Sequence, residues 1–176
     1  MLFIAIGLGL VGCGQEKVNK TLEKYEIENA NVEKSEGDFI FRLISEKKEY
    51  EDGEDVKLYG EIIYTGEKDE ITIHHSSSAI LFSMEEKVSG YDIGFAVDDI
   101  GLSTTLKKGI PYREEYAKSG GYSEEDPKEY VEFMEEFLNG DRFPPGYYVV
   151  NGETDFSIED QERVKIKATI DFKVIE

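Results

Sequence analysis

The chain has 176 residues, of which 39 are acidic and 20 basic, so its formal net charge at neutral pH is −19. Apolar residues make up 39% of it and include 11 Tyr and 10 Phe, which excludes a disordered acidic polymer and indicates a domain with a hydrophobic core. So large an excess of acid argues against nucleic acid as a partner, because binding it requires Lys or Arg to replace condensed counterions.

The first twelve residues carry no charge and read MLFIAIGLGLVG. A spanning helix needs about 20 apolar residues, so this run is too short and is typical of the apolar part of a signal peptide. The only cysteine, Cys13, follows Leu10, Val11 and Gly12 and precedes a polar stretch. A buried free cysteine is the alternative interpretation, since free Cys is among the most buried residue types.

The segment Leu10-Val11-Gly12-Cys13 resembles the lipobox of bacterial lipoproteins. In that family signal peptidase II cleaves before the cysteine, whose sulfur carries a diacylglyceryl group. The resemblance implies that residues 1–12 are a signal peptide and that lipid on Cys13 anchors the protein at the extracytoplasmic face of the cell membrane. Two acyl chains give lasting attachment where a single chain is marginal.

Residues 14–38 are rich in Glu, Lys, Asn and Ser, and their apolar residues are sparse. We predict that residues 13–38 form a lipidated cysteine and a polar tether, with a root-mean-square span of about 25 to 30 Å. Val18, Leu22 and Tyr25 stand at helical spacing and favour a short helix over residues 18–25.

From residue 39 to residue 176 the main period is two, which is typical of half-buried strands. In residues 164–174 the even-numbered residues are apolar and the odd-numbered residues from Lys165 to Lys173 are polar, so the even face should be core. Asn151-Gly152 predicts a tight hairpin turn. Further strands are expected at 39–43, 56–64, from 71, 80–84, 91–97, 102–106, 147–150 and 153–158. Seven to nine short strands indicate a mainly β, antiparallel sandwich.

A helical insertion near residues 112–139 interrupts the strands. Asp126, Pro127 and Glu129 predict a helix start with a side-chain cap, and Asn139-Gly140 predicts its end. Residues 112–118 are expected to form a shorter helix. The apolar residues at helical spacing between these signals are Tyr130, Phe133, Met134, Phe137 and Leu138.

Residues 39–64 and 143–174, including FPPGYYVVNGETDFS, resemble the immunoglobulin-like sandwiches of Bacillus-type surface lipoproteins. More distantly they resemble the Bacillus intracellular proteinase inhibitor family. The resemblance implies an immunoglobulin-like fold for the domain, and it makes proteinase inhibition an alternative function. The helical insertion has no counterpart in the plain inhibitor sandwich.

The sequence contains no recognised catalytic motif, and we expect no catalytic residue, metal site or cofactor. His74 and His75 are adjacent, so on a strand they point to opposite faces and cannot chelate one metal. Ser76, Ser77 and Ser78 beside them are interpreted as a polar strand end rather than as nucleophiles. Acidic clusters such as Glu124-Glu125-Asp126 are interpreted as solvated surface, with Ca²⁺ binding as the alternative.

Tyr112, Tyr116 and Tyr122 surround a Gly-Gly loop and are the candidate partner-binding residues, because tyrosine is common in recognition surfaces. Glu114, Glu115 and the acids at 124–126 would form a rim that attracts a cationic protein, peptide or small molecule. The function expected from these features is that of a lipid-anchored extracytoplasmic binding or scaffolding module. The alternatives are a proteinase-inhibitor-like domain and, third, a surface hydrolase.

Overall fold

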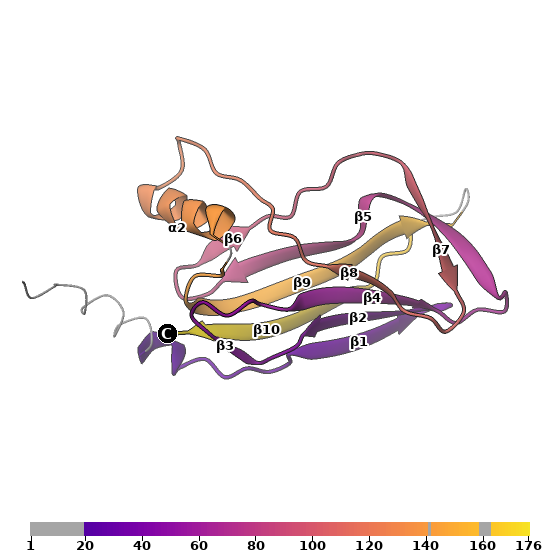
Figure 1. Cartoon of the computed structure of the whole chain (residues 1–176), viewed down its shortest axis with the longest axis horizontal. Helices are drawn as coiled ribbons and strands as arrows, with labels where there is room; N and C mark the ends of the chain where they lie inside the picture. Colours follow the sequence, from indigo (N-terminus) through magenta and orange to yellow (C-terminus); the bar gives the residue numbers. More distant parts are fainter. Residues whose placement is uncertain (1–19, 141, 159–162) are drawn as a thin grey trace, which may run out of the picture.

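The alternating residues form two β-sheets packed face to face, and the helix α2 (Lys128–Asn139) lies across one end (Figure 1). The computed structural model describes residues 20–140, 142–158 and 163–176. One sheet has four strands, in the order β1 (Asn31–Glu36), β2 (Phe39–Ser45), β4 (Leu58–Tyr64) and β8 (Tyr112–Glu115). The other has the order β3 (Glu49–Glu51), β10 (Lys167–Ile175), β9 (Gly146–Ser157), β5 (Glu70–Glu86) and β6 (Tyr91–Ile93), and β7 (Leu102–Lys107) also pairs with β5.

Six of the ten described strands follow the order found in immunoglobulin-like sandwiches. Strands β2, β4 and β8 take the places of strands A, B and E, and β10, β9 and β5 take those of G, F and C. Near the start of β9 the Tyr148 hydroxyl donates to the Pro144 carbonyl at 2.7 Å, which is the tyrosine corner of such folds. The predicted mainly β sandwich with a helical insertion is therefore confirmed, but the described residues form ten strands rather than seven to nine, and β3 pairs with β10 in parallel.

The core lies between the two sheets, and close packing there decides where glycine is needed. A Cβ atom on Gly152 would lie 2.9 Å from the Leu43 methyl groups across the sandwich. The predicted turn at Asn151-Gly152 is wrong, because β9 runs through both residues. Glycine is needed at position 152 because a side chain there would clash with Leu43 of the facing sheet. The large, fully buried core residues include Tyr50, Tyr148, Phe41, Phe82, Phe137, Phe156 and Phe172.

Strand β5 is a single long strand where two were predicted, but its pairing with β9 is interrupted. His75 pairs with Phe156 and Ile80 pairs with Thr154, so the register shifts between them. Residues 76–79 therefore leave the ladder on the β9 side. This irregular stretch, called the β5 bulge below, lies beside the edge of the four-stranded sheet.

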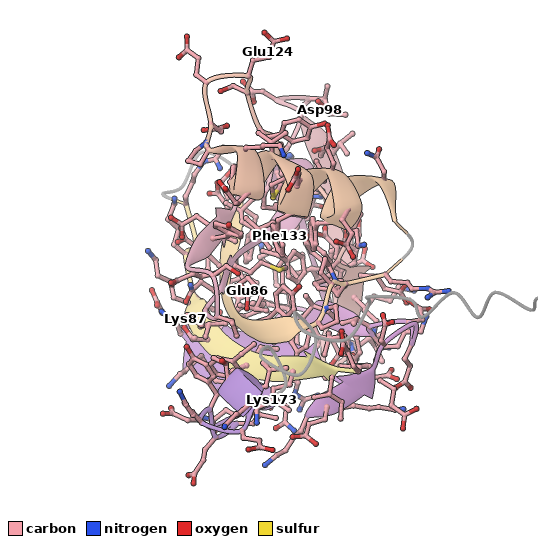
Figure 2. The ribbon with its side chains drawn as sticks, turned by 90° about the vertical axis from the view of Figure 1, so that its left-hand side faces the viewer. Glu86, Lys87, Asp98, Glu124, Phe133 and Lys173 are labelled. Carbon is pink, nitrogen blue, oxygen red and sulfur yellow. The ribbon has the colours of Figure 1, made fainter. Side chains whose placement is uncertain are left out.

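Helix α2 ends at Asn139 as predicted, and its buried face carries Met134 and Phe137. Figure 2 looks along the sandwich onto this helix and shows Phe133 on the side that faces the body of the molecule. The cation that satisfies its last carbonyls comes from a distant segment, since Lys118 Nζ donates to the Phe137 and Gly140 carbonyls at 2.8 and 2.9 Å.

Two predictions about the insertion are wrong. The helix has no side-chain cap, because the Asp126 carboxylate accepts the Ser123 N–H at 2.7 Å in the preceding turn and the cap position is Pro127. Residues 112–115 form β8 rather than a short helix, because they pair with β4 and complete the four-stranded sheet. The helical part of the insertion is thus confined to α2.

The predicted tether is folded from residue 20 onward. Residues 20–22 are helical, which agrees with part of the helix expected over 18–25, and Leu22 is 2% exposed. The Tyr25 ring stacks on Tyr147 with 4.5 Å between the centroids, and residues 31–36 form β1. Residues 20–30, called the strap below, pack against the sandwich because contacts far along the chain bury their few apolar groups.

Asp171 holds the strap. Its carboxylate accepts the N–H groups of Glu28 and Asn29 at 2.8 and 2.7 Å and the Tyr147 hydroxyl at 2.8 Å. The expectation that Asp171 and Lys173 lie on a solvated face is wrong, since they are only 5% and 8% exposed. The even-numbered face of β10 is core, as predicted.

Replacing Asp171 with alanine should release the strap. We expect Asp171→Ala to lower the free energy of unfolding by about 3 kcal/mol, because three buried or half-buried donors lose a charged acceptor. The exposed neighbour Thr169 on the same strand provides the control, and Thr169→Ala should change stability by less than about 0.5 kcal/mol. Urea unfolding and proteolysis within residues 20–30 measure both effects, and equal shifts for the two variants would contradict the assignment.

Candidate functional site

A cleft of about 390 Å³ opens where the edge of the four-stranded sheet meets the β5 bulge. The connection between β6 and β7, which Figure 1 shows running back along the molecule, forms its other wall. We call it the β8 cleft. Its lining residues are Ser77, Ser78, Phe95, Ala96, Val97, Tyr112, Glu114, Glu115, Ala117, Lys118 and Ser119.

Hydrogen bonds of Ser77 and Ser119 hold the walls of the β8 cleft in place. The Ser77 N–H donates to the Asp98 carbonyl at 3.0 Å, and the Asp98 N–H donates to Ser77 Oγ at 2.8 Å. Across the cleft, the Ala96 N–H donates to Ser119 Oγ at 3.1 Å. These bonds fix the β6–β7 connection against both the β5 bulge and the segment after β8, so the cleft is preformed.

The Glu114 carboxylate forms the base of the cleft. It accepts the Ala79 N–H at 3.0 Å and the Ser78 hydroxyl, and it shares the Ile80 N–H with Ser78 Oγ, each acceptor lying 3.2 Å from the Ile80 nitrogen. The Tyr112 hydroxyl donates to it as well, at 2.7 Å. This carboxylate thus supplies the acceptors that the β5 bulge loses where its ladder is interrupted.

Tyr112 is a fixed neutral hydrogen-bonding group in the cleft. Burial of the half-buried ring and the hydrogen bond to the Glu114 carboxylate raise the pKa of Tyr112 to about 12. Both causes act against the charged phenolate. The hydroxyl therefore keeps its proton throughout the physiological range and holds Glu114 from the cleft side.

The three predicted tyrosines do not form one surface. Tyr116 packs among the rings of Phe82, Phe95 and Phe143, at centroid distances of 5.8 to 6.0 Å. Its buried hydroxyl has no well-aligned hydrogen-bond partner among the described residues, and burial raises its pKa far more than the nearby Ser119 backbone lowers it. Tyr116 therefore belongs to the packing beneath the cleft rather than to a contact surface.

Tyr122 lies outside the cleft. It is 40% exposed, and its hydroxyl donates to Glu135 of α2 at 3.3 Å. Figure 2 shows Glu124 at the tip of the loop that precedes α2, projecting away from the body. Of the predicted acidic rim, Glu114 and Glu115 line the cleft.

The two histidines belong to the β5–β7 ladder. His74 is exposed and His75 is buried, so they point to opposite faces as expected. His75 bonds the Ser76 carbonyl and Thr104 Oγ1 at 2.7 and 2.9 Å, and His74 lies 2.8 Å from Ser103 Oγ in an exposed cross-strand pair. In the described part of the chain neither ring bonds a serine of the cleft.

Within residues 20–140, 142–158 and 163–176 no group of three or more His, Cys, Asp or Glu side chains could hold a metal ion. None of the helices described there has the length and apolar character to span a membrane. Cys13, the predicted lipidation site, lies outside the described residues, so its modification stays a prediction.

Tyr112 and the acidic Glu114 are recognisable from the sequence as residues of interest, whereas the roles of Ser77, Ser78 and Phe95 are not. The signal that was present is the alternation of Tyr112, Glu114 and Tyr116, which places the three side chains on one face of a strand. No protein-family model matches this sequence, and no curated protein matches it significantly.

Proposed function

We propose that the protein is a lipid-anchored binding module outside the cytoplasm, and that it captures cationic peptide segments in the β8 cleft. The observation that carries the proposal is the Glu114 carboxylate, fixed at the base of a preformed cleft whose rim includes the apolar side chains of Phe95 and Val97. A fixed acid beside apolar surface suits a side chain with a long apolar stem and a positive tip, as in Lys. The net charge of −19 steers such partners toward the molecule.

The lipobox resemblance supports the anchor, and the strap limits its reach. Only seven residue steps separate Cys13 from Lys20, where the described fold begins. A fully extended chain spans at most about 3.5 Å per residue, so this connection reaches no more than about 25 Å. The proposed anchor therefore keeps the sandwich near the membrane surface, closer than a 25-residue coil would allow.

The alternative function, proteinase inhibition, is supported by the sandwich fold, because the inhibitor family that the sequence resembles is also a sandwich. One fold hosts many functions, so the fold by itself does not select inhibition over other kinds of binding. The surface-hydrolase alternative is not supported by the cleft, whose hydroxyls all have structural partners. Binding is the function that the arrangement of charge and apolar surface supports best.

The anchor is tested by replacing the cysteine. In cells that receive a complete signal peptide, Cys13→Ser should shift the protein from the membrane fraction to an unprocessed precursor or to the medium, because no thiol remains to carry lipid. Gln15→Ser, two residues away, keeps the lipobox and should stay in the membrane fraction. Equal membrane retention of the two variants in fractionation experiments would contradict the proposed anchor.

Binding is tested with a defined probe. An N-acetylated, C-amidated ten-residue peptide that alternates Lys and Val should bind the unlipidated full-length chain in calorimetry, more weakly as NaCl is raised, whereas a Glu-Val peptide should not bind. Val97→Lys places a positive charge on the cleft rim and should weaken binding, but Ile110→Lys, on another exposed apolar residue, should have little effect. Absence of binding, or equal effects of both variants, would refute the proposed site.

A further inference from the structure

One edge of β8 has free backbone hydrogen-bonding groups. The Tyr116 N–H donates to the Leu58 carbonyl at 2.9 Å, and two-residue steps along the register pair Glu114 with Gly60 and Tyr112 with Ile62. In an antiparallel pair only alternate residues direct their N–H and C=O toward the partner strand. Arg113 and Glu115 therefore direct theirs away from β4, and among the described strands β4 is the partner of β8.

This free edge faces the β8 cleft. Glu115 and Ala117 line the cleft from the β8 side, and Ala96 and Val97 line it from the opposite wall. An extended polypeptide in the cleft would thus lie beside the exposed N–H and C=O groups of β8. Such edges are templates for an added strand, in which backbone bonds give affinity and alternate side chains give specificity.

The cations close to this edge are already occupied. The Arg113 guanidinium donates to the Glu61 carboxylate at 2.8 and 3.1 Å and lies 3.8 Å from the centroid of the Tyr59 ring. The Lys118 ammonium is held by the carbonyls that end α2. Lys57, which also feels the Glu115 charge, is paired with Asp55. Among the described residues at this edge, an arriving positive side chain therefore meets the Glu114 and Glu115 carboxylates and cations that already have partners.

We propose that the occupant of the β8 cleft is an extended basic segment of a partner polypeptide, added as a strand to the free edge of β8. This inference rests on the proposed function and specifies its binding mode. Inward-facing side chains of the added strand lie near Glu114, so basic residues are favoured at every second position, and β-branched residues between them favour the extended conformation. Outward-facing side chains lie beside Glu115.

Hydrogen exchange tests this mode directly on the full-length chain with the Lys-Val peptide. The Arg113 and Glu115 amides should exchange rapidly in the free protein and slow at least tenfold when the peptide is bound. The Ser35 amide is the internal control. It lies on the opposite edge strand of the same sheet, where the register directs alternate residues away from β2, and its exchange should not change.

Variants give a second measurement. Glu115→Pro removes one free-edge N–H while keeping a residue type that edge strands tolerate, and it should weaken peptide binding roughly tenfold or more. Glu115→Gln keeps the N–H and removes only the charge, so it should weaken binding by a smaller factor and reduce the salt dependence. Ser35→Pro is the matched proline control on the other edge and should bind as wild type does.

The outcomes separate the two proposals. If the peptide binds but the Arg113 and Glu115 amides keep their exchange rates, strand addition is wrong and the binding function stands. If the peptide does not bind at millimolar concentration, both proposals fail. If Glu115→Pro does not fold, the exchange measurement on the wild-type protein decides.

Discussion

A strand that leaves its ladder inside a sandwich must find new acceptors for its N–H groups, and in this protein the Glu114 carboxylate provides them. Each buried N–H without a partner would destabilise the fold by about 1 to 3 kcal/mol. Glu114 comes from the four-stranded sheet and binds Ala79 and Ile80 of the six-stranded sheet, so it also joins the two sheets at this edge. The cleft, its fixed charge and the neutral Tyr112 all follow from this contact.

Other carboxylates play the same part elsewhere in the molecule. Asp171 binds backbone N–H groups of the strap, and the Glu86 carboxylate accepts those of Val88 and Ser89 at 2.9 and 2.8 Å. Glu86 also accepts the Tyr147 N–H at 3.1 Å, next to Gly146, where a Cβ would lie 2.8 Å from the carboxylate. Part of the acidic excess is therefore structural, and the surface acids that remain produce the field that favours cations.

The parts of the fold that the sequence predicted are those governed by local pattern. The alternation along β10 identified its core face, and the helical spacing from Tyr130 to Leu138 identified α2. Predictions failed where distant contacts decide the structure. Asn151-Gly152 predicts a turn, but the approach of the other sheet is what requires glycine at position 152. The alternation along β10 predicts that Asp171 is solvated, but the strap covers it through Asn29 and Glu28, which lie 142 and 143 residues away in the sequence.

The candidate site was only partly predictable for the same reason. Tyr112 and Glu114 were identified as residues of interest, because tyrosine and acid stand together in the sequence. Tyr116 was placed with them, but it follows the end of β8 and its ring packs against those of Phe82 and Phe143 beneath the cleft. The β5 bulge that gives Glu114 its role depends on the register between β5 and β9, which no local pattern reveals.

The most direct test of this account is amide hydrogen exchange at Ala79 and Ile80 in a Glu114→Gln variant. Glutamine keeps the shape of the side chain but replaces one acceptor oxygen with a donor group. The account predicts that both amides are protected in the wild-type protein and that Ala79, whose acceptor is Glu114, loses protection in the variant, while Ile80, which also bonds Ser78 Oγ, loses less and the core amide of Val150 keeps its own. Unchanged protection of Ala79 would show that Glu114 is not the acceptor on which the cleft depends.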